Sequence, residues 1–173
     1  MLTNLSLTKQ THCQEYFYER GGNMLFFDLG KLPGQQSMLI FHALAQMGIE
    51  ALVIVSPKSP LVSIGYFQDA AQEVDLHYCK ESKISFMRRE VGGGATYLDD
   101  NQIFYQLIWR KDNPKFPKAI HDIYPWFSEA PVETYRNFGI QAEYRAINDI
   151  ITNEGRKIAG EGGGNIGECM VFV

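Results

Sequence analysis

Two spacings of apolar residues alternate along the chain, and each predicts a different kind of element. The helical spacing predicts three helices, over residues 35–47, 70–80 and 116–138. Gly48 is placed to end the first helix, and Asp69 is placed to cap the second. The third segment contains Pro125 and Pro131, which should break it into shorter helices because proline removes a backbone donor.

Short apolar runs and alternating runs predict strands. They cover residues 24–27, 51–55, 61–67, 84–89, 103–109, 141–146, 147–152, 156–160 and 170–173. Residues 56–60 should join two of these strands into a strand–turn–strand unit, and residues 153–155 should form another turn. Strands outnumber helices, so we expect an α+β fold with a mixed, largely antiparallel sheet flanked by helices.

Composition bears on the number of domains. With 173 residues, 45% of them hydrophobic, the chain is long enough for one globular domain with a core. Residues 1–22 are polar and are expected to form a loosely attached N-terminal leader, which leaves residues 23–173 as the domain. The first residues lack the apolar core of a signal peptide, and no apolar run is long enough to span a membrane.

Charge and cysteine content argue against several classes of function. The net charge of -4 comes from interspersed acids and bases, so no surface for nucleic acid or for an anionic membrane is expected. Cys13, Cys79 and Cys169 show no metal-binding spacing, and their odd number argues against a secreted disulfide framework. We therefore expect a reducing, cytoplasmic location.

A run of three glycines follows the strand predicted over residues 84–89. Consecutive glycines let the backbone adopt positive φ and bring N–H groups close to an anion, although a mobile turn is the alternative interpretation. Gly92, Gly93 and Gly94 match neither of the two common nucleotide loops, GxxxxGK[ST] and GxGxxG. Alternation puts Arg88 and Arg89 on opposite faces, so one guanidinium can be buried and would need an anionic partner, either a ligand or an internal salt bridge.

A lysine lies among apolar residues in the last predicted hairpin. Strand periodicity puts Lys157 and Ala159 on the same face. If that face is covered, the ammonium can hold a phosphate or carboxylate oxygen; if it is not, Lys157 is an ordinary solvated residue. Asn148 and Asp149 offer the oxygen ligands that Mg²⁺ prefers. Together these groups suit adenylate chemistry.

Three segments resemble a known family. Residues 88–99, RREVGGGATYLD, resemble the RRxxGGGxxxHD motif of lipoate-protein ligases and their relatives. Residues 61–69 resemble that family's strand leading to a Gly-x-x-Gln segment, and residues 145–160 are similar to its R-x-x-ND followed by GRKIxG. The resemblance covers roughly residues 22–173, and two ordered motifs at the right separation make coincidence improbable.

The resemblance implies a fold, an activity and partners. The fold would be that of biotin-protein ligases, which is related to class II aminoacyl-tRNA synthetases. The activity would be activation of lipoate or octanoate by Mg²⁺-ATP as an acyl-adenylate, followed by transfer to a lysine of a carrier protein. The implied partners are a lipoyl carrier domain and an accessory domain or subunit.

The resemblance also implies residue roles. Lys157 would be the catalytic residue, holding carboxyl and phosphate oxygens as charge develops on them. The adenylate-binding residues would be Arg89, Gly92, Gly93, Gly94, Ala95, Asn148 and Asp149. Asn148 and Asp149 would also orient Mg²⁺. No nucleophile is needed, whereas one branch of the superfamily's transferases, which carry acyl groups on a cysteine, has that cysteine where Arg145 stands. A lipoyl or octanoyl transferase using a thioester donor, with Cys79 or Cys169 as nucleophile, is the alternative.

Several positions depart from the family pattern. Leu98 replaces a histidine, Glu161-Gly162 replaces a small Ser-Ala pair, and Glu168-Cys169 lies near a missing His-Gly pair. The second glycine run, residues 162–164, is expected to form a flexible hairpin loop. The four histidines His12, His42, His77 and His121 lie outside the motifs and are expected at the surface or with satisfied hydrogen bonds.

Length leads to one further expectation. Catalytic domains of this family continue well beyond the strand predicted over residues 170–173, so we expect an incomplete catalytic domain. A non-catalytic ligand-binding fragment that depends on a partner is a second alternative.

Overall fold

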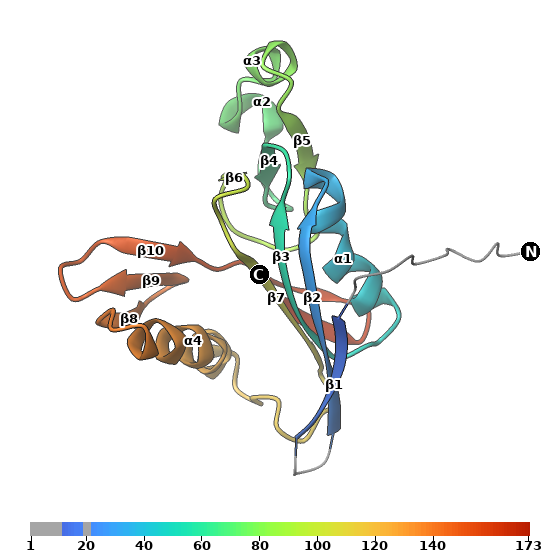
Figure 1. Cartoon of the computed structure of the whole chain (residues 1–173), viewed down its shortest axis with the longest axis vertical. Helices are drawn as coiled ribbons and strands as arrows, with labels where there is room; N and C mark the ends of the chain where they lie inside the picture. The colour runs from blue at the N-terminus through green and yellow to red at the C-terminus, as the bar shows by residue number, and fades with distance from the viewer. Residues whose placement is uncertain (1–11, 19–21) are drawn as a thin grey trace, which may run out of the picture.

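A six-stranded sheet forms the centre of the molecule (Figure 1). The computed structural model describes residues 12–18 and 22–173. The strand order is β1 (His12–Tyr18), β2 (Gly22–Leu32), β3 (Ala51–Pro57), β7 (Phe104–Arg110), β12 (Cys169–Phe172) and β11 (Gly163–Ile166). Only the β2–β3 pair of this sheet is parallel. The predicted mixed, largely antiparallel sheet is therefore confirmed.

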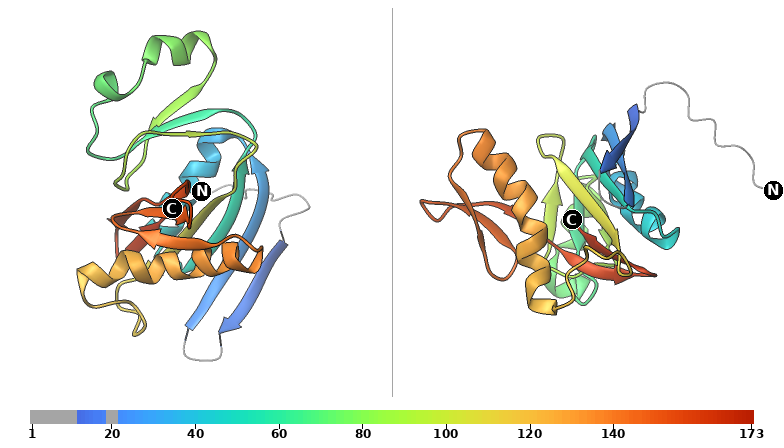
Figure 2. Two further views of the ribbon diagram at one scale, coloured as in Figure 1. Left: turned by 90° about the vertical axis from the view of Figure 1, so that its left-hand side faces the viewer. Right: turned by 90° about the horizontal axis from the view of Figure 1, so that it is seen from below.

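Two three-stranded sheets lie beside the central one (Figures 1 and 2). The first contains β5 (Ser85–Arg88), β4 (Leu61–Ile64) and β6 (Thr96–Leu98), with α2 (Ala70–Glu73) and α3 (Leu76–Glu81) at its far end. The second contains β10 (Lys157–Gly160), β9 (Asp149–Thr152) and β8 (Ala142–Arg145), and we call these three strands, residues 142–160, the arm.

Helices cover opposite faces of the central sheet, α1 (Gly34–Gln46) on one and α4 (Ile120–Asn137) on the other. The alternation of β12 explains both contacts. Val171 belongs to the cluster that contains Phe41 of α1, whereas Phe172 stacks on Phe127 of α4 with ring centroids 3.8 Å apart. Further along α4, Val132 packs on the arm, so this helix joins the arm to the sheet.

The helices confirm one prediction and correct two. α1 begins and ends close to the predicted bounds, and Gly48 follows it with φ +69°. The predicted break at Pro125 and Pro131 is wrong, because α4 is continuous through both prolines. Its buried residues, Ile123, Phe127, Ser128 and Val132, lie on both sides of the prolines. This packing outweighs the local cost of proline. The segment predicted as one helix over residues 70–80 is two helices, because Asp75 caps a second one.

Four strand predictions also need correction. β3 and β4 lie in different sheets, so they form no strand–turn–strand unit. The second glycine run enters β11 instead of a flexible hairpin loop, and β6 was not predicted. Of the leader predicted over residues 1–22, residues 1–11 and 19–21 lie outside the described part, and β1 is a strand where none was expected. In the described part, no helix is both long and apolar enough to cross a membrane.

Candidate functional site

The first glycine run, residues 92–94, is held between β4 and β11; we call it the glycine loop. The backbone N–H of Gly92 donates to the carbonyl of Gly163 at 3.1 Å, and Tyr66 donates to Val91 at 3.0 Å. Gly93 has φ +100°, a conformation that favours glycine. A Cβ at Gly65 would lie 2.0 Å from the Gly93 carbonyl oxygen, so the close approach requires glycine there too. The loop is fixed by backbone packing.

The Arg89 guanidinium braces this loop from beneath. Only 4% of the residue is exposed, and its donors reach the carbonyls of Gly92 at 2.9 Å, Gly94 at 2.8 Å and Ser63 at 3.1 Å. Burial lowers the pKa of the guanidinium. One buried arginine was predicted and is found, but within the described residues its partners are carbonyls and the Ser63 hydroxyl, and no carboxylate forms an ion pair with it. Arg88 is exposed on the other face.

The two glycine runs pack against each other, which the sequence did not predict. Beyond the hydrogen bond between Gly92 and Gly163, a Cβ at Gly162 would lie 2.9 Å from the Gly92 oxygen. A Cβ at Gly164 would lie 3.1 Å from the Cα of Val91. Glycine is therefore required at position 162 because the first run lies against it, whereas at Gly163 the side chains of Phe172 and Tyr124 occupy the space. Two matching runs in one sequence were the available signal.

Lys157 forms an ion pair on the arm, and 54% of its side chain is exposed. Its Nζ lies 2.6 Å from Asp149 Oδ1 and 2.9 Å from where a Gly160 Cβ would stand. The predicted shared face of Lys157 and Ala159 is wrong: a register shift separates them, and both Ile158 and Ala159 pack on the same apolar cluster. Bulges of this kind redirect side chains. Here the ammonium lies over the end of β10 that leads to the second glycine run.

Asp149 accepts from two cations at once. Arg145 donates from β8 at 2.8 Å, and Lys157 donates from β10. Hydrogen bonds from Lys157 and then Arg145 hold the pKa of Asp149 below its usual range. Asn148, its neighbour, donates its amide to the carbonyl of Glu161 at 2.5 Å. The structure thus brings the predicted residues Asn148, Asp149 and Lys157 together on one hairpin.

The predicted Mg²⁺ ligands fit an ion only in part. Within the described residues, no group of three His, Cys, Asp or Glu side chains gathers at one point. Asp149 and Asn148 are too few for an all-protein cage, but Mg²⁺ at phosphate sites takes most of its ligands from phosphate oxygens and water. Both oxygens of Asp149 already accept from cations, so a metal ion would compete with Lys157 or Arg145 there.

Glu161 is a buried carboxyl that motif analysis did not assign to the site. It is 4% exposed, and it accepts hydrogen bonds from the hydroxyl groups of Tyr105, at 2.6 Å, and Ser128. Burial raises the pKa of Glu161. The only signal in the sequence was its departure from the small pair that the family has after KIxG. Leu98, another departure, packs with the core beneath α1.

His42 fastens α1 to the chain just before the glycine loop. Its Nε2 accepts from the backbone N–H of Glu90 at 3.0 Å, and its Nδ1 lies 3.1 Å from the carbonyl of Met38. This pattern requires a neutral ring with the proton on Nδ1, and burial lowers the pKa of His42. The expectation of a satisfied histidine is confirmed at this position. His77 and His121 are exposed.

The described thiols are buried. Cys79 and Cys169 are both free, and burial raises the pKa of Cys169. A raised pKa disfavours the thiolate, which is the nucleophilic form. Neither cysteine lies in the arm or the glycine loop, where the other candidate residues gather.

The mixed sheet with its braced glycine loop and lysine-bearing hairpin places the chain in the class of biotin- and lipoate-ligase catalytic domains. The model of the family described as "Lipoyl protein ligase A/B catalytic domain" matches residues 34–171. The chain belongs to this family.

Relatives and solved structures agree with this assignment. The octanoyltransferase LipM of Geobacillus kaustophilus is 30% identical over 124 residues, which are 69% of this chain and 44% of that protein. A bi-partite lipoate protein ligase from Thermoplasma acidophilum, solved in work that included its E2 lipoyl domain, has a TM-score of 0.71 and 28% identity, covering 84% of this chain and 58% of that chain. A lipoate-protein ligase A bound with ATP has a TM-score of 0.68 and 26% identity, covering 82% and 62%. The chain thus spans less than two thirds of each of these proteins.

Proposed function

We propose that this chain provides the adenylate-forming centre of a lipoate-protein ligase. A carboxylate oxygen of lipoate or octanoate attacks the α-phosphorus of ATP, and pyrophosphate leaves. The amine of a carrier lysine then attacks the acyl carbonyl, AMP leaves, and the proton of the amine passes to solvent. The observation that carries the proposal is the half-exposed Lys157 ammonium, which lies over Gly160 at the end of the arm nearest the packed glycine runs.

Residues of the glycine loop would bind the adenylate, and a charged residue of the arm would stabilise the transition state. The backbone of Gly92 to Gly94 and Ala95 would line the adenylate. The Gly92 N–H already donates to Gly163, so the N–H groups that the glycines leave unshielded for binding are those of Gly93, Gly94 and Ala95. Lys157 would break its ion pair with Asp149, and its ammonium would then hold the carboxyl and phosphate oxygens, on which negative charge grows in the transition state. The donors of Arg89 are taken by loop carbonyls, so we assign it to bracing the loop that contacts the acyl-adenylate.

Asp149 and Asn148 would hold Mg²⁺ together with phosphate oxygens. When bound, the ion neutralises phosphate charge and orients the nucleotide. Lys157 would exchange Asp149, which also accepts from Arg145, for the acyl carboxylate. The chain itself places the Lys157 ammonium and the Asp149 carboxylate 2.6 Å apart, so that both groups lie at the same place on the arm.

The carrier and a second polypeptide are proposed partners. One relative is described as a bi-partite ligase studied with an E2 lipoyl domain, and this chain covers 58% of that structure. We infer that a lipoyl carrier domain supplies the acceptor lysine and that an accessory domain or subunit completes the acyl pocket. We propose a cytoplasmic location without a nucleic-acid or membrane partner.

Octanoyl transfer from a thioester is the second candidate, because LipM proteins are octanoyltransferases and match this chain. A thioester mechanism needs an accessible thiolate. Cys79 and Cys169 are buried, and Arg145 occupies the position where the resemblance places a transferase cysteine. These observations favour the ligase.

A two-armed assay tests the proposal. The protein is incubated with lipoate, Mg²⁺-ATP and a lipoyl carrier domain, with and without a candidate accessory subunit, and the carrier is followed by intact mass. We expect ATP-dependent acylation of the carrier lysine that persists after Cys79→Ser and Cys169→Ser. A covalent thioester on the protein, formed from an acylated carrier without ATP, would instead establish the transferase.

A further inference from the structure

Glu161 lies between the two regions that the proposed function brings together. Before it stands Gly160, the last residue of β10, over which the Lys157 ammonium lies. After it stands Gly162, which is a glycine so that the Gly92 carbonyl can lie against it. The lysine-bearing hairpin and the glycine loop are therefore connected through this one residue.

Glu161 is anchored by its backbone to the arm and by its side chain to the rest of the molecule. Its N–H donates to the carbonyl of Asn148 at 2.8 Å, and its carbonyl accepts from the Asn148 amide. Its carboxyl points the other way, to the hydroxyl groups of Tyr105 on β7 and Ser128 on α4. A single buried side chain thus ties the arm to both the central sheet and α4.

Hydroxyl groups hold Glu161, and within the described residues no cation forms an ion pair with it. The ionisable groups that face it are Tyr105 on β7, Tyr124 on α4 and Tyr144 on β8. The Ser128 hydroxyl has one proton but two acceptors, the Glu161 carboxyl and the Tyr124 carbonyl. An amide nitrogen in place of that carboxyl oxygen would donate to Ser128 and satisfy both. The groups around Glu161 therefore require a side chain of this size and hydrogen-bonding capacity, and they do not require its negative charge.

We infer that Glu161 is a positioning residue, which fixes the arm and its Lys157 against the glycine runs through hydrogen bonds to Tyr105 and Ser128. The inference rests on the proposed adenylation function. Displacement of a transition-state contact by about 1 Å costs on the order of 10²-fold in rate, so a loosened junction lowers kcat even though Glu161 touches no substrate. Removing the carboxyl also leaves the Tyr105 hydroxyl without its acceptor, whereas the Ser128 hydroxyl keeps the Tyr124 carbonyl.

The test compares Glu161→Ala with Glu161→Gln, which keeps the hydrogen bonds. The control is Glu143→Ala, an exposed carboxylate on β8 of the same arm. Two measurements are made: the kinetics of lipoate-dependent pyrophosphate release from ATP, which give kcat and KM, and amide hydrogen exchange over residues 149–160. Tyr105→Phe deletes one donor only and takes the place of Glu161→Ala if that variant does not fold.

We expect Glu161→Ala to lower kcat by about 10- to 100-fold with little change in KM and to speed exchange across the arm. Glu161→Gln should stay within about threefold of the parent, as should the control at Glu143. A folded Glu161→Ala protein with parental kcat, or a Glu161→Gln protein as defective as Glu161→Ala, overturns the inference. If the parent protein releases no pyrophosphate, the proposed adenylation activity is wrong. Amide hydrogen exchange then tests the positioning role by itself, and an unchanged exchange rate in Glu161→Ala overturns that role.

Discussion

The glycine loop and the arm meet at Glu161, yet they are held by opposite means. The loop is fixed by buried contacts: Arg89 is 4% exposed and donates to loop carbonyls, and the Gly93 carbonyl leaves no room for a side chain at Gly65. Two cations of the arm, Lys157 and Arg145, are about half exposed and share a single carboxylate. The contacts of the loop are buried, whereas the half-exposed cations of the arm are accessible to other anions.

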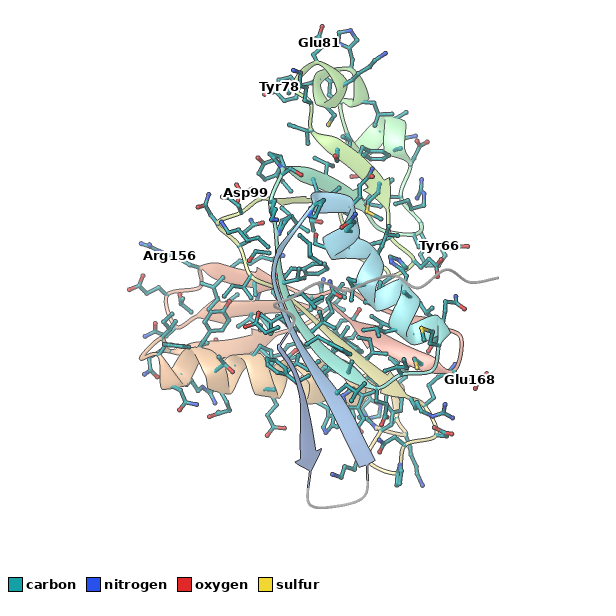
Figure 3. The ribbon with its side chains drawn as sticks, turned by 45° about the vertical axis from the view of Figure 1, so that its right-hand side comes forward. Tyr66, Tyr78, Glu81, Asp99, Arg156 and Glu168 are labelled. Carbon is teal, nitrogen blue, oxygen red and sulfur yellow. The ribbon has the colours of Figure 1, made fainter. Side chains whose placement is uncertain are left out.

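The loop and the arm therefore differ in the free energy needed to disturb their contacts. A buried polar network is costly to disturb, because any group that loses its partner remains without water. A solvent-exposed ion pair is worth little, so a ligand can take over one of its members at small cost. The loop is thus suited to present fixed N–H groups, and Lys157 is suited to leave Asp149 for an anion. Figure 3 shows Arg156, next to that lysine, at the outer end of the arm, where 79% of its side chain is exposed.

The largest expected effect tests the mobile half of this comparison. Lys157→Ala should reduce lipoate-dependent pyrophosphate release by about 10²- to 10³-fold, because one preorganised contact to a transition-state oxyanion contributes about 3–4 kcal/mol. The melting temperature should hardly change, since the side chain is half exposed. Lys80→Ala, an exposed lysine on α3, is the control. Parental release from the Lys157 variant would remove this residue from the mechanism.

The next effect tests the rigid half. Gly65→Ala puts a Cβ 2.0 Å from the Gly93 oxygen, so the loop must shift, and overpacking of this kind costs about 1–3 kcal/mol. Gly94→Ala is the matched control, because nothing lies within 4 Å of its Cβ position. Urea unfolding should separate the two variants. Equal midpoints would show that the loop accommodates the added Cβ without a loss of stability and is not held rigidly.

A smaller effect concerns pH and the attachment of the loop to α1. The pKa of His42 is lowered in the folded protein from the ordinary 6.5, mainly by burial, so the unfolded chain binds more protons below that pH. Its stabilisation, about 1 kcal/mol for the hydrogen bond from Glu90, is complete above about pH 6.5 and is lost as pH falls through the folded pKa. The nearby carboxylate of Glu90 opposes the shift.

Thermal unfolding between pH 7.5 and 5 checks this sign. His42→Gln keeps an acceptor for the Glu90 N–H but does not titrate, so its melting temperature should fall less on acidification than that of the parent. Parallel curves for the two proteins would contradict the assignment of a neutral His42 at this position.

Local pattern was enough to predict most elements and the place of both motifs. Strand alternation correctly put Arg88 and Arg89 on opposite faces, and helical spacing correctly located α1. It failed where tertiary packing decides. Both prolines of α4 are tolerated because residues on either side of them are buried. The shift beside Lys157 breaks the alternation, because Ile158 and Ala159 both pack on the cluster around Ile150.

Glu161 shows why part of the site could not be predicted. Its hydrogen-bond partners, Tyr105 and Ser128, lie 56 and 33 residues earlier in the chain and carry no motif of their own. The role of Arg89 could be predicted only in part. Its burial was predictable from the sequence, but its hydrogen bonds to the loop carbonyls were not. Residue type indicates which partner a group needs, and only the fold determines which partner it meets.

The smallest expected effect completes the comparison of loop and arm. Asp149→Asn removes the charge that Lys157 and Arg145 share, but both cations remain hydrated, so unfolding free energy should fall by only about 0.2–1 kcal/mol. Added salt at about 0.5 M should shrink the difference further, because exposed charges are screened. Urea unfolding at two salt concentrations measures both quantities. A larger loss that persists in salt would mean that the arm, like the glycine loop, depends on a buried network, and Lys157 would then not be free to leave Asp149.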